Sequence, residues 1–247
     1  MPALEGKRAI VTGAASGFGA GIARAFANEG AHVMVADINA HAAKAVAAEI
    51  GGRPQTVDVS SGASVHAMAG AVKAAWGGID IIVNNAGTTH PKGPLEEVAE
   101  ADFDRVFAVN AKSVYLLARE FVPMMKAAGG GAILNVASTA GLSPRPHLNW
   151  YNASKGWMIT ATKAMAVELA PAGIRVNALA PVAGETPLLK EFLGEDTPEM
   201  RAKFLATIPI GRFSQPEDLG AAAVFLCSDA ASMITGVALE VDGGRCI

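Results

Sequence analysis

Tyr151 and Lys155 stand four positions apart in the stretch YNASKGW, at the start of an otherwise apolar segment. On a helix, positions i and i+4 share a face, so the phenol and the ammonium would lie side by side. A free phenol titrates at about pH 10, and an adjacent positive charge favours the phenolate and lowers that pKa. Such a pair could exchange protons near neutral pH. Equally, both polar tips of a surface pair could extend into water, and the pair alone does not decide between these interpretations.

Ser138 and Asn110 are polar residues in apolar surroundings. Ser138 follows the strand-like run at 132–137 and precedes Tyr151 by 13 positions (151 − 138). The intervening loop can carry the chain to a helix that begins near Trp150. Asn110 lies inside the helix-like stretch DFDRVFAVNAKSVYLLA, where an interior Asn is unfavourable unless it has a structural or catalytic role.

The first strand-like run ends in a glycine-rich turn, TGAASGFG at 12–19, with glycines at 13, 17 and 19. Glycines at a strand-to-helix turn let the backbone approach a pyrophosphate, and the free N–H groups and the helix dipole favour negative charge. Tight turns use glycine in any case, so the turn alone is a weak signal.

Asp37 ends the second strand-like run, roughly 20 residues further on, where a carboxylate can accept hydrogen bonds from a ribose diol. It would also repel a 2′-phosphate, and no Arg or Lys stands at 36–40 to attract one. Asp37 therefore favours NAD over NADP. The alternative is that Asp37 caps the next helix, a position that Asn39 could take instead.

The third and fourth strand-like runs end in Asp58-Val59 and in Asn84-Asn-Ala-Gly87. Small and amide side chains at strand ends suit an adenine edge and a ribose that pass over a sheet, although the same residue types also form turns. Their recurrence at consecutive strand ends favours the ligand-binding interpretation.

Short apolar runs alternate with alanine-rich helical runs along the chain. Predicted strands span 8–12, 32–36, 54–57, 79–83, 132–137, 174–178 and 237–241. Predicted helices span 17–29, 40–50, 63–76, 101–127, 151–170, 187–207 and 216–227. This alternation predicts a single α/β domain over 1–247: a doubly wound, seven-stranded parallel sheet with helices on both faces. The stretch at about 183–212 interrupts the rhythm, and we expect it to form a substrate-covering lobe above the carboxyl ends of the strands.

The composition argues against several classes of function. The net charge is −3 and no basic stripe is present, which gives no electrostatic case for nucleic acid. The two cysteines, Cys227 and Cys246, form no CxxC and have no ligand spacing, so neither a disulfide framework nor a metal site is expected. No uncharged apolar run reaches membrane-spanning length, and the N-terminus lacks the pattern of a signal peptide. We therefore expect a cytoplasmic protein with no membrane partner.

Together these motifs resemble the single-domain, Rossmann-fold branch of the short-chain dehydrogenase/reductase family, over essentially the whole chain. The resemblance is carried by TGAASGFG (12–19), Asp37, Asp58, NNAG (84–87), Asn110, Ser138, YNASK (151–155), IRVNALAP (174–181) and VDGG (241–244). Each motif is modest singly, but their conjunction in this order and spacing is specific.

The resemblance implies an NAD-dependent oxidoreductase that interconverts a secondary alcohol and a ketone by hydride transfer. Tyr151 would be the general acid/base. Lys155 would lower the pKa of Tyr151 and hold the nicotinamide ribose, and Ser138 would orient the substrate oxygen. Asn110 is expected to hold a water that links Lys155 to solvent, in a locally kinked helix.

Thr186 matches the residue that binds the nicotinamide carboxamide. The full set of cofactor positions implied by the resemblance is Gly13, Ser16, Gly17, Phe18, Gly19, Asp37, Asp58, Val59, Asn85, Ala86, Gly87, Tyr151, Lys155, Pro181, Val182 and Thr186. The chain departs from the family where Pro181-Val182 replaces the usual Pro-Gly, which limits backbone freedom beside the nicotinamide.

The substrate is expected between Ser138, Tyr151 and the lobe. The main candidates for the wall of the substrate pocket are Ala140, Arg145, His147, Leu188 and Leu189. Further candidates are Thr88, Thr89, His90, Leu142, Trp150 and Phe192. Arg145 and His147 could clamp an anionic group, or both could be solvated loop residues.

The helix at 151–170 is apolar on nearly all sides, whereas a monomer would need one face exposed to water. The resemblance implies a homotetramer, with the helices near 101–127 and 151–170 at one interface and the C-terminal tail at another.

Alternative functions are a 3-oxoacyl-[acyl-carrier-protein] reductase, against which Asp37 and the net charge argue, and a sugar or polyol dehydrogenase. A non-catalytic dinucleotide-binding scaffold would be expected to have lost Tyr151 or Lys155.

Overall fold

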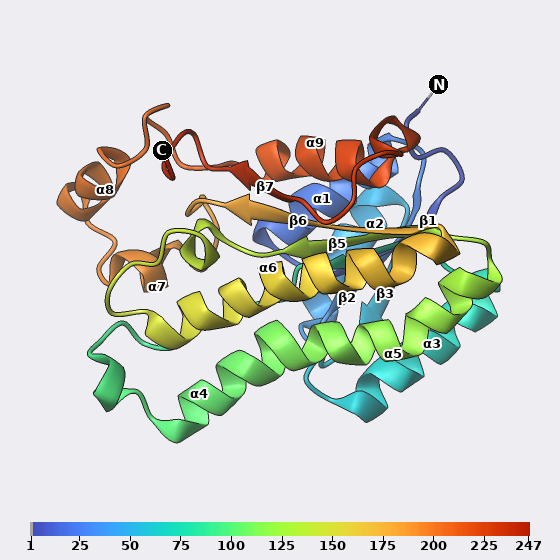
Figure 1. Ribbon diagram of the computed structural model, residues 1–247, viewed down its shortest axis with the longest axis horizontal. Coiled ribbons are helices and arrows are strands. Elements are labelled where there is room, and N and C mark those ends of the chain that lie inside the picture. Colours follow the sequence, from blue (N-terminus) through green and yellow to red (C-terminus); the bar gives the residue numbers. More distant parts are fainter. Residues whose placement is uncertain (1) are drawn as a thin grey trace.

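The computed structural model describes residues 2–247. Within them, seven parallel strands form one sheet in the order β3-β2-β1-β4-β5-β6-β7, as the alternating pattern predicts (Figure 1). The strands are β1 (Arg8–Thr12), β2 (His32–Asp37), β3 (Arg53–Thr56), β4 (Ile81–Asn84), β5 (Gly131–Val136), β6 (Ile174–Pro181) and β7 (Ala238–Val241).

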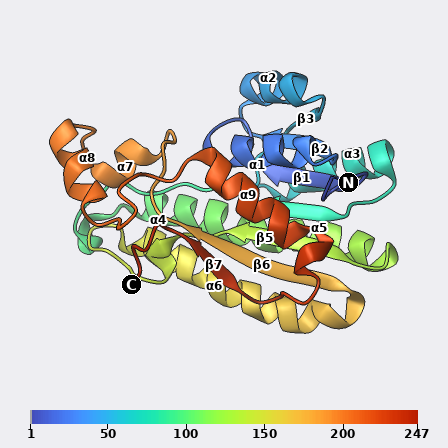
Figure 2. The ribbon, with the colours of Figure 1, turned by 90° about the horizontal axis from the view of Figure 1, so that it is seen from above.

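Helices cover both faces of the sheet (Figure 2). One face packs against α1 (Gly17–Asn28), α2 (Ala40–Ile50) and α9 (Pro216–Cys227); the other packs against α3 (Gly62–Trp76), α5 (Ser113–Ala127) and α6 (Asn149–Leu169). Because side chains alternate along a strand, Ala9 and Val11 of β1 enter the first core, and Ile10 enters the second. The doubly wound prediction is confirmed.

The segment predicted as one helix at 101–127 is three consecutive elements. α4 (Glu100–Phe107) leads into a π-helical turn, Ala108–Lys112, which leads into α5. The extra residue of a π-turn widens the helix locally, and such turns are frequent at functional sites. Asn110 occupies the middle of this turn, so the local kink expected there is confirmed.

The single helix predicted at 187–207 is wrong. The structure has two short helices instead, α7 (Leu189–Leu193) and α8 (Pro198–Leu205), which project beyond the end of the sheet (Figure 1). Gly194 ends α7 with a φ of 85°, a conformation that continues no right-handed helix. Thr197 then caps α8 through the N–H of Met200, with Pro198 in the first turn.

Short 3₁₀ turns occur at Leu95–Glu97, Thr139–Gly141, Ala170–Ala172 and Asp229–Ala231.

The strand order reverses direction between β1 and β4. At this point doubly wound sheets bind ligands, above the carboxyl ends of their strands. No helix among the described residues is both long and apolar enough to cross a bilayer.

Candidate active site

A cavity of about 710 Å³ lies above the carboxyl ends of the strands and extends to the lobe. All of the predicted cofactor positions line it: Gly13, Ser16, Gly17, Phe18, Gly19, Asp37, Asp58, Val59, Asn85, Ala86, Gly87, Tyr151, Lys155, Pro181, Val182 and Thr186. Ser138 lines it as well. The topology therefore gathers residues from seven segments of the sequence into one cavity.

The glycine-rich turn forms a cradle in which side chains have no room. Gly13 has a φ of 63°, and a Cβ on it would lie 2.8 Å from the Cα of Ala86. A Cβ on Gly19 would collide with the carbonyl oxygen of Gly13. The N-cap residue of α1, Ser16, makes no side-chain cap, so the first-turn N–H groups are left for a ligand. These features fit the pyrophosphate of a dinucleotide.

Asp37 lies half-buried at the end of β2, on the wall of the cavity. One carboxylate oxygen accepts from the N–H of Ala15 at 3.0 Å and the other from the N–H of Asn39 at 2.9 Å. Asn39, not Asp37, caps α2 by accepting from the N–H of Ala42. The alternative that Asp37 serves as the helix cap is therefore wrong, and its carboxylate is fixed beside the cradle.

Thr12 and Asn85 join the glycine-rich turn to the end of β4. The Thr12 hydroxyl accepts from the N–H groups of Asn85 and Ala86, both at 3.1 Å. The Asn85 amide donates back to the carbonyl oxygens of Thr12 and Gly13, at 2.8 and 3.1 Å. These bonds hold the two strand ends at the spacing that the cavity needs.

Tyr151 and Lys155 are buried in the cavity wall, which excludes the solvated surface pair. Burial raises the pKa of Tyr151 to about 12, although a hydrogen bond with the Ser138 side chain opposes the shift. Burial lowers the pKa of Lys155 to about 8. The expectation that the lysine charge brings the phenol pKa below its ordinary value is thus wrong in this state, because desolvation disfavours both charged forms.

The side chain of Lys155 extends from α6 to the end of β5. Its Nζ donates to the carbonyl oxygen of Val136 at 2.8 Å and lies 5.9 Å from the centre of the Tyr151 ring. A Cβ on Gly87 would lie 3.4 Å from this Nζ. The ammonium therefore faces the cavity between the ends of β4 and β5.

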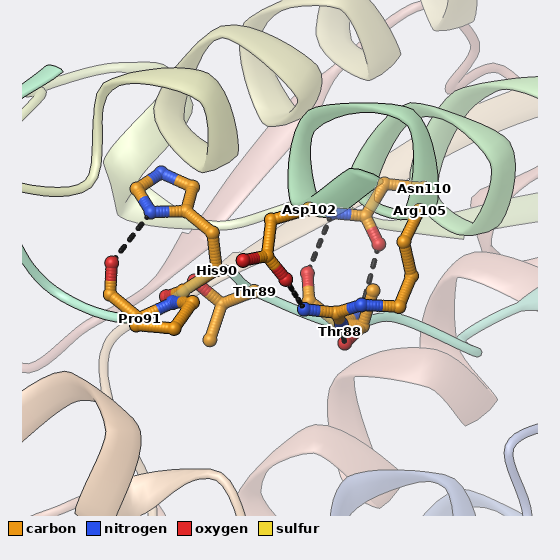
Figure 3. A network of polar contacts seen from close by, with 7 residues as sticks. All are labelled: Thr88, Thr89, His90, Pro91, Asp102, Arg105 and Asn110. Carbon is orange, nitrogen blue, oxygen red and sulfur yellow. Dashed lines mark hydrogen bonds and ion pairs between the residues drawn. The ribbon is translucent and has the colours of Figure 1, made fainter. Parts of the chain in front are cut away.

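Asn110 lies behind the cavity wall and is fully buried. Its Oδ1 accepts from the N–H of Thr88 at 2.9 Å, and its Nδ2 donates to the carbonyl oxygen of Thr88 and to Ser154 Oγ, both at 2.9 Å. Figure 3 shows Thr88 bound by Asn110 and also by Arg105, which donates to the Thr88 hydroxyl at 2.6 Å. Arg105 in turn donates to the carboxylate of Asp102 at 2.6 Å. The side chain of Asn110 thus ties the π-turn to the loop after β4 and to α6. Its part in a water relay stays a prediction.

The remaining wall of the cavity comes from the lobe and from the loops after β4 and β5. Ala140, Arg145, His147, Leu188, Phe192 and Thr88 line it as predicted, whereas Thr89, His90, Leu142 and Trp150 do not. Leu189 is also outside the cavity. It is buried in a small core, because Leu189 and Leu193 on α7 pack with Ile208 and Phe213.

Val182, which stands where the family has glycine, belongs to the same small core. Its N–H donates to the carbonyl oxygen of Val241 at 3.3 Å, and its φ is not positive. The close approach that requires glycine occurs at Gly184, where a Cβ would collide with the ring of Phe18. The replacement anchors the lobe to the end of β6 without backbone strain.

Several residues that line the cavity were not predicted from the sequence, among them Lys92, Phe204 and Arg245. Arg245 belongs to the C-terminal tail, and it lines the cavity of its own chain. Its apolar neighbours in the sequence gave no signal of this, because only the pairing of β7 with β6 brings the tail to the cavity.

Comparison with known proteins assigns the family. The family model described as enoyl-(acyl carrier protein) reductase matches residues 13–245. A 4-formylbenzenesulfonate dehydrogenase of Comamonas testosteroni is 51% identical over 98% of this chain and 98% of its own length. The chain belongs to the short-chain dehydrogenase/reductase family. It is an oxidoreductase that uses a nicotinamide dinucleotide to interconvert alcohols and ketones.

Other members of the family differ in their named substrates. A D-threitol dehydrogenase of Mycolicibacterium smegmatis is 42% identical over 99% of this chain and 94% of its own length. The crystal structure of a 3-ketoacyl-(acyl-carrier-protein) reductase from Brucella melitensis complexed with NADH is 51% identical. It superposes with a TM-score of 0.94 over 99% of this chain and 100% of that one. The family thus leaves the substrate of this chain open.

Proposed function

We propose that the protein is an NAD-dependent dehydrogenase in which Tyr151 is the general acid/base. The observation that carries this proposal is the buried Ser138, Tyr151 and Lys155 group on the wall of a cavity that also contains the glycine cradle. Asp37 supports NAD over NADP, because its fixed carboxylate suits a ribose diol and repels a 2′-phosphate.

The dinucleotide, when bound, supplies a nicotinamide ring that exchanges a hydride with the carbinol carbon. In reduction, Tyr151 donates its proton to the carbonyl oxygen, and in oxidation it accepts the proton of the alcohol. Ser138 holds the same oxygen in place. With a pKa of about 12, Tyr151 is protonated at neutral pH and is ready to act as the acid.

We propose that the lobe at 183–212 covers a substrate that contains a ring. Leu188, Phe192 and Phe204 give the cavity an apolar wall beside Tyr151, and the ring centres of Phe192 and Tyr151 lie 5.3 Å apart. Such a wall suits a ring better than a polyol chain. The named substrate of the relative from Comamonas testosteroni, 4-formylbenzenesulfonate, supports this choice.

A homotetramer and a cytoplasmic location belong to the same proposal. Val167 and Trp157 on α6 are 80% and 41% exposed in the single chain, which leaves an apolar helix face for a neighbour. Both cysteines, Cys227 and Cys246, are free thiols, as is usual in a reducing compartment.

Replacing Tyr151 with Phe tests the proposed mechanism. The variant keeps the ring and its packing but loses the transferable proton, so turnover should fall at least about 100-fold. NADH binding, measured by fluorescence titration, should stay within a few-fold of wild type. The assay compares NADH and NADPH with a panel of cyclic ketones and aromatic aldehydes.

Retained turnover in Tyr151→Phe would contradict the acid/base role. A clear preference for NADPH in the wild-type protein would contradict the argument from Asp37. Cell fractionation and light scattering test the location and the assembly.

A further inference from the structure

Three cationic side chains line the cavity: Lys92 in the loop after β4, Arg145 in the loop before α6 and Arg245 in the tail after β7. Among residues 2–247, none of the ion pairs includes any of these three side chains. The acids of the cavity wall lie toward the opposite edge of the sheet, where Asp37 ends β2 and Asp58 follows β3. The cavity is therefore polarised.

Arg245 is held in place by the lobe. Its guanidinium lies over the ring of Phe204, 4.7 Å from the ring centre, and it donates to the hydroxyl of Thr207. Partial burial lowers the pKa of Arg245, and the charge of Arg145 lowers it further, against the opposing effects of Cys246 and Asp242. The two guanidinium groups thus repel each other across the cavity, and an anion between them would relieve that repulsion.

Arg145 is tied to the helix that carries Tyr151. The buried side chain of Asn152 donates to the carbonyl oxygen of Arg145 at 2.7 Å. Two residues on, His147 adopts a left-handed backbone with a φ of 70°, and its carbonyl oxygen accepts from the N–H of Gly93 at 3.1 Å. The loop that carries Arg145 is therefore anchored both to α6 and to the loop after β4.

An apolar ring lies beside the acid/base, and a second one lies beside the guanidinium of Arg245. Phe192 packs beside Tyr151, and Phe204 packs under Arg245. Both rings line the cavity. A ligand that extends from Tyr151 toward Arg245 would pass along these rings and end between planar, five-donor cations that match a carboxylate or a sulfonate.

We propose that Arg145 and Arg245 form a subsite for an acid group, a carboxylate or a sulfonate, on the far side of the substrate ring from the oxygen that meets Tyr151. This inference rests on the proposed function, since it places the reacting oxygen at Tyr151. It assigns the substrate class: ring compounds with a carbonyl or alcohol at one end and an acid group at the other.

The test compares two probes of nearly equal shape, 4-oxocyclohexanecarboxylate and 4-oxocyclohexanecarboxamide, with 4-formylbenzoate and 4-formylbenzamide as a second pair. We expect the wild-type protein to prefer each acid over its amide by about 10-fold or more in kcat/KM, the range of a charge-assisted hydrogen bond. In R145Q, R245Q and the double variant, this ratio should fall toward one, mainly through a higher KM for the acid.

Arg53→Gln is the matched control, because Arg53 is an exposed arginine on β3 that lines no part of the cavity. Its acid-to-amide ratio should equal that of wild type. A ratio near one in the wild-type protein, or a ratio unchanged in R145Q and R245Q, would overturn the subsite while leaving the proposed function intact.

If no carbonyl compound were turned over with either cofactor, the proposed function would fail. A binding measurement with an acid ligand would still test whether the subsite exists. Ligand-observed NMR with benzenesulfonate gives this second measurement. Saturable binding that is lost in the double variant supports the subsite, whereas no binding, or equal binding in the double variant, overturns it.

Discussion

Burial sets the protonation of the two central side chains. It raises the pKa of Tyr151 to about 12 and lowers that of Lys155 to about 8, because a low-dielectric environment disfavours phenolate and ammonium alike. Near neutral pH, Tyr151 is thus protonated and can donate a proton. Lys155 is still charged at this pH, and burying its charge lowers the free energy of unfolding. A group arranged in this way is prepared to reduce a carbonyl compound.

Replacing Lys155 with Met should reveal this cost. Between pH 8 and 10.5 the folded protein binds fewer protons at Lys155 than the unfolded chain does, so the lysine's contribution to the free energy of unfolding rises with pH. The ammonium should therefore cost up to about 3 kcal/mol at pH 7, at 1.36 kcal/mol per pKa unit. We expect Lys155→Met to gain stability over wild type at pH 7 and to lose that advantage toward pH 10.5.

Urea denaturation of both proteins at a series of pH values measures the difference directly. Taking the difference removes titrations that the two proteins share, including that of Tyr151. A stability difference that did not vary from pH 7 to 10.5 would contradict the burial effect.

Replacing Asp37 with Asn should weaken the choice between the two cofactors. The amide keeps the shape of the side chain but loses the charge that repels a 2′-phosphate. We expect the Kd for NADH to rise and that for NADPH to fall, so that their ratio shifts by about 10-fold or more. Fluorescence titration with each cofactor measures both values, and an unchanged ratio would mean that other residues set the preference.

At the scale of elements, the 3₁₀ turn at Thr139–Gly141 must lie directly on α6 for Ser138 to reach Tyr151. A Cβ on Gly141 would lie 2.7 Å from the backbone carbon of Lys155, closer than real atoms approach. Gly141→Ala should therefore separate the turn from the helix, lower stability by about 1–3 kcal/mol and reduce turnover. Thermal unfolding and the reductase assay measure the two effects.

Gly156→Ala is the matched control on the other side of the same contact. A Cβ there would lie 3.7 Å from the carbonyl oxygen of Gly141, an ordinary contact. Because alanine also favours a helix over glycine by about 1 kcal/mol, this variant should be at least as stable as wild type. Equal losses in the two variants would show that the contact is less tight than the structure indicates.

For the whole molecule, the exposed apolar face of α6 predicts an interface with a second subunit. Tyr115 on α5 is 54% exposed and Val167 on α6 is 80% exposed, which is costly for apolar side chains that face water. We expect light scattering to give the mass of four chains for wild type. Val167→Glu should reduce this mass, because an unpaired charge is expensive to bury.

Lys44→Glu is the control for this prediction, since Lys44 is exposed on α2, on the opposite face of the sheet. It should leave the mass unchanged. A wild-type mass of one chain would contradict the assembly altogether.

The order of the elements, the parallel sheet and the cofactor positions on the cavity wall could be predicted from the sequence. Strand and helix periodicities are local, and short motifs such as TGAASGFG and YNASK combine in an order that few folds permit. The cradle, Asp37 and the Ser138, Tyr151 and Lys155 group could therefore be predicted residue by residue.

The remaining features depend on contacts between distant parts of the chain. The break between α7 and α8 depends on Gly194 and on a small core that Leu189 shares with distant Phe213. The pKa values of Tyr151 and Lys155 depend on how deeply α6 is buried, which no spacing of residues reports. Arg245 and Arg145 line the same cavity although they stand 100 positions apart (245 − 145). The pairing of β7 with β6 sets where the tail begins, and such a long-range arrangement has no local sequence signal.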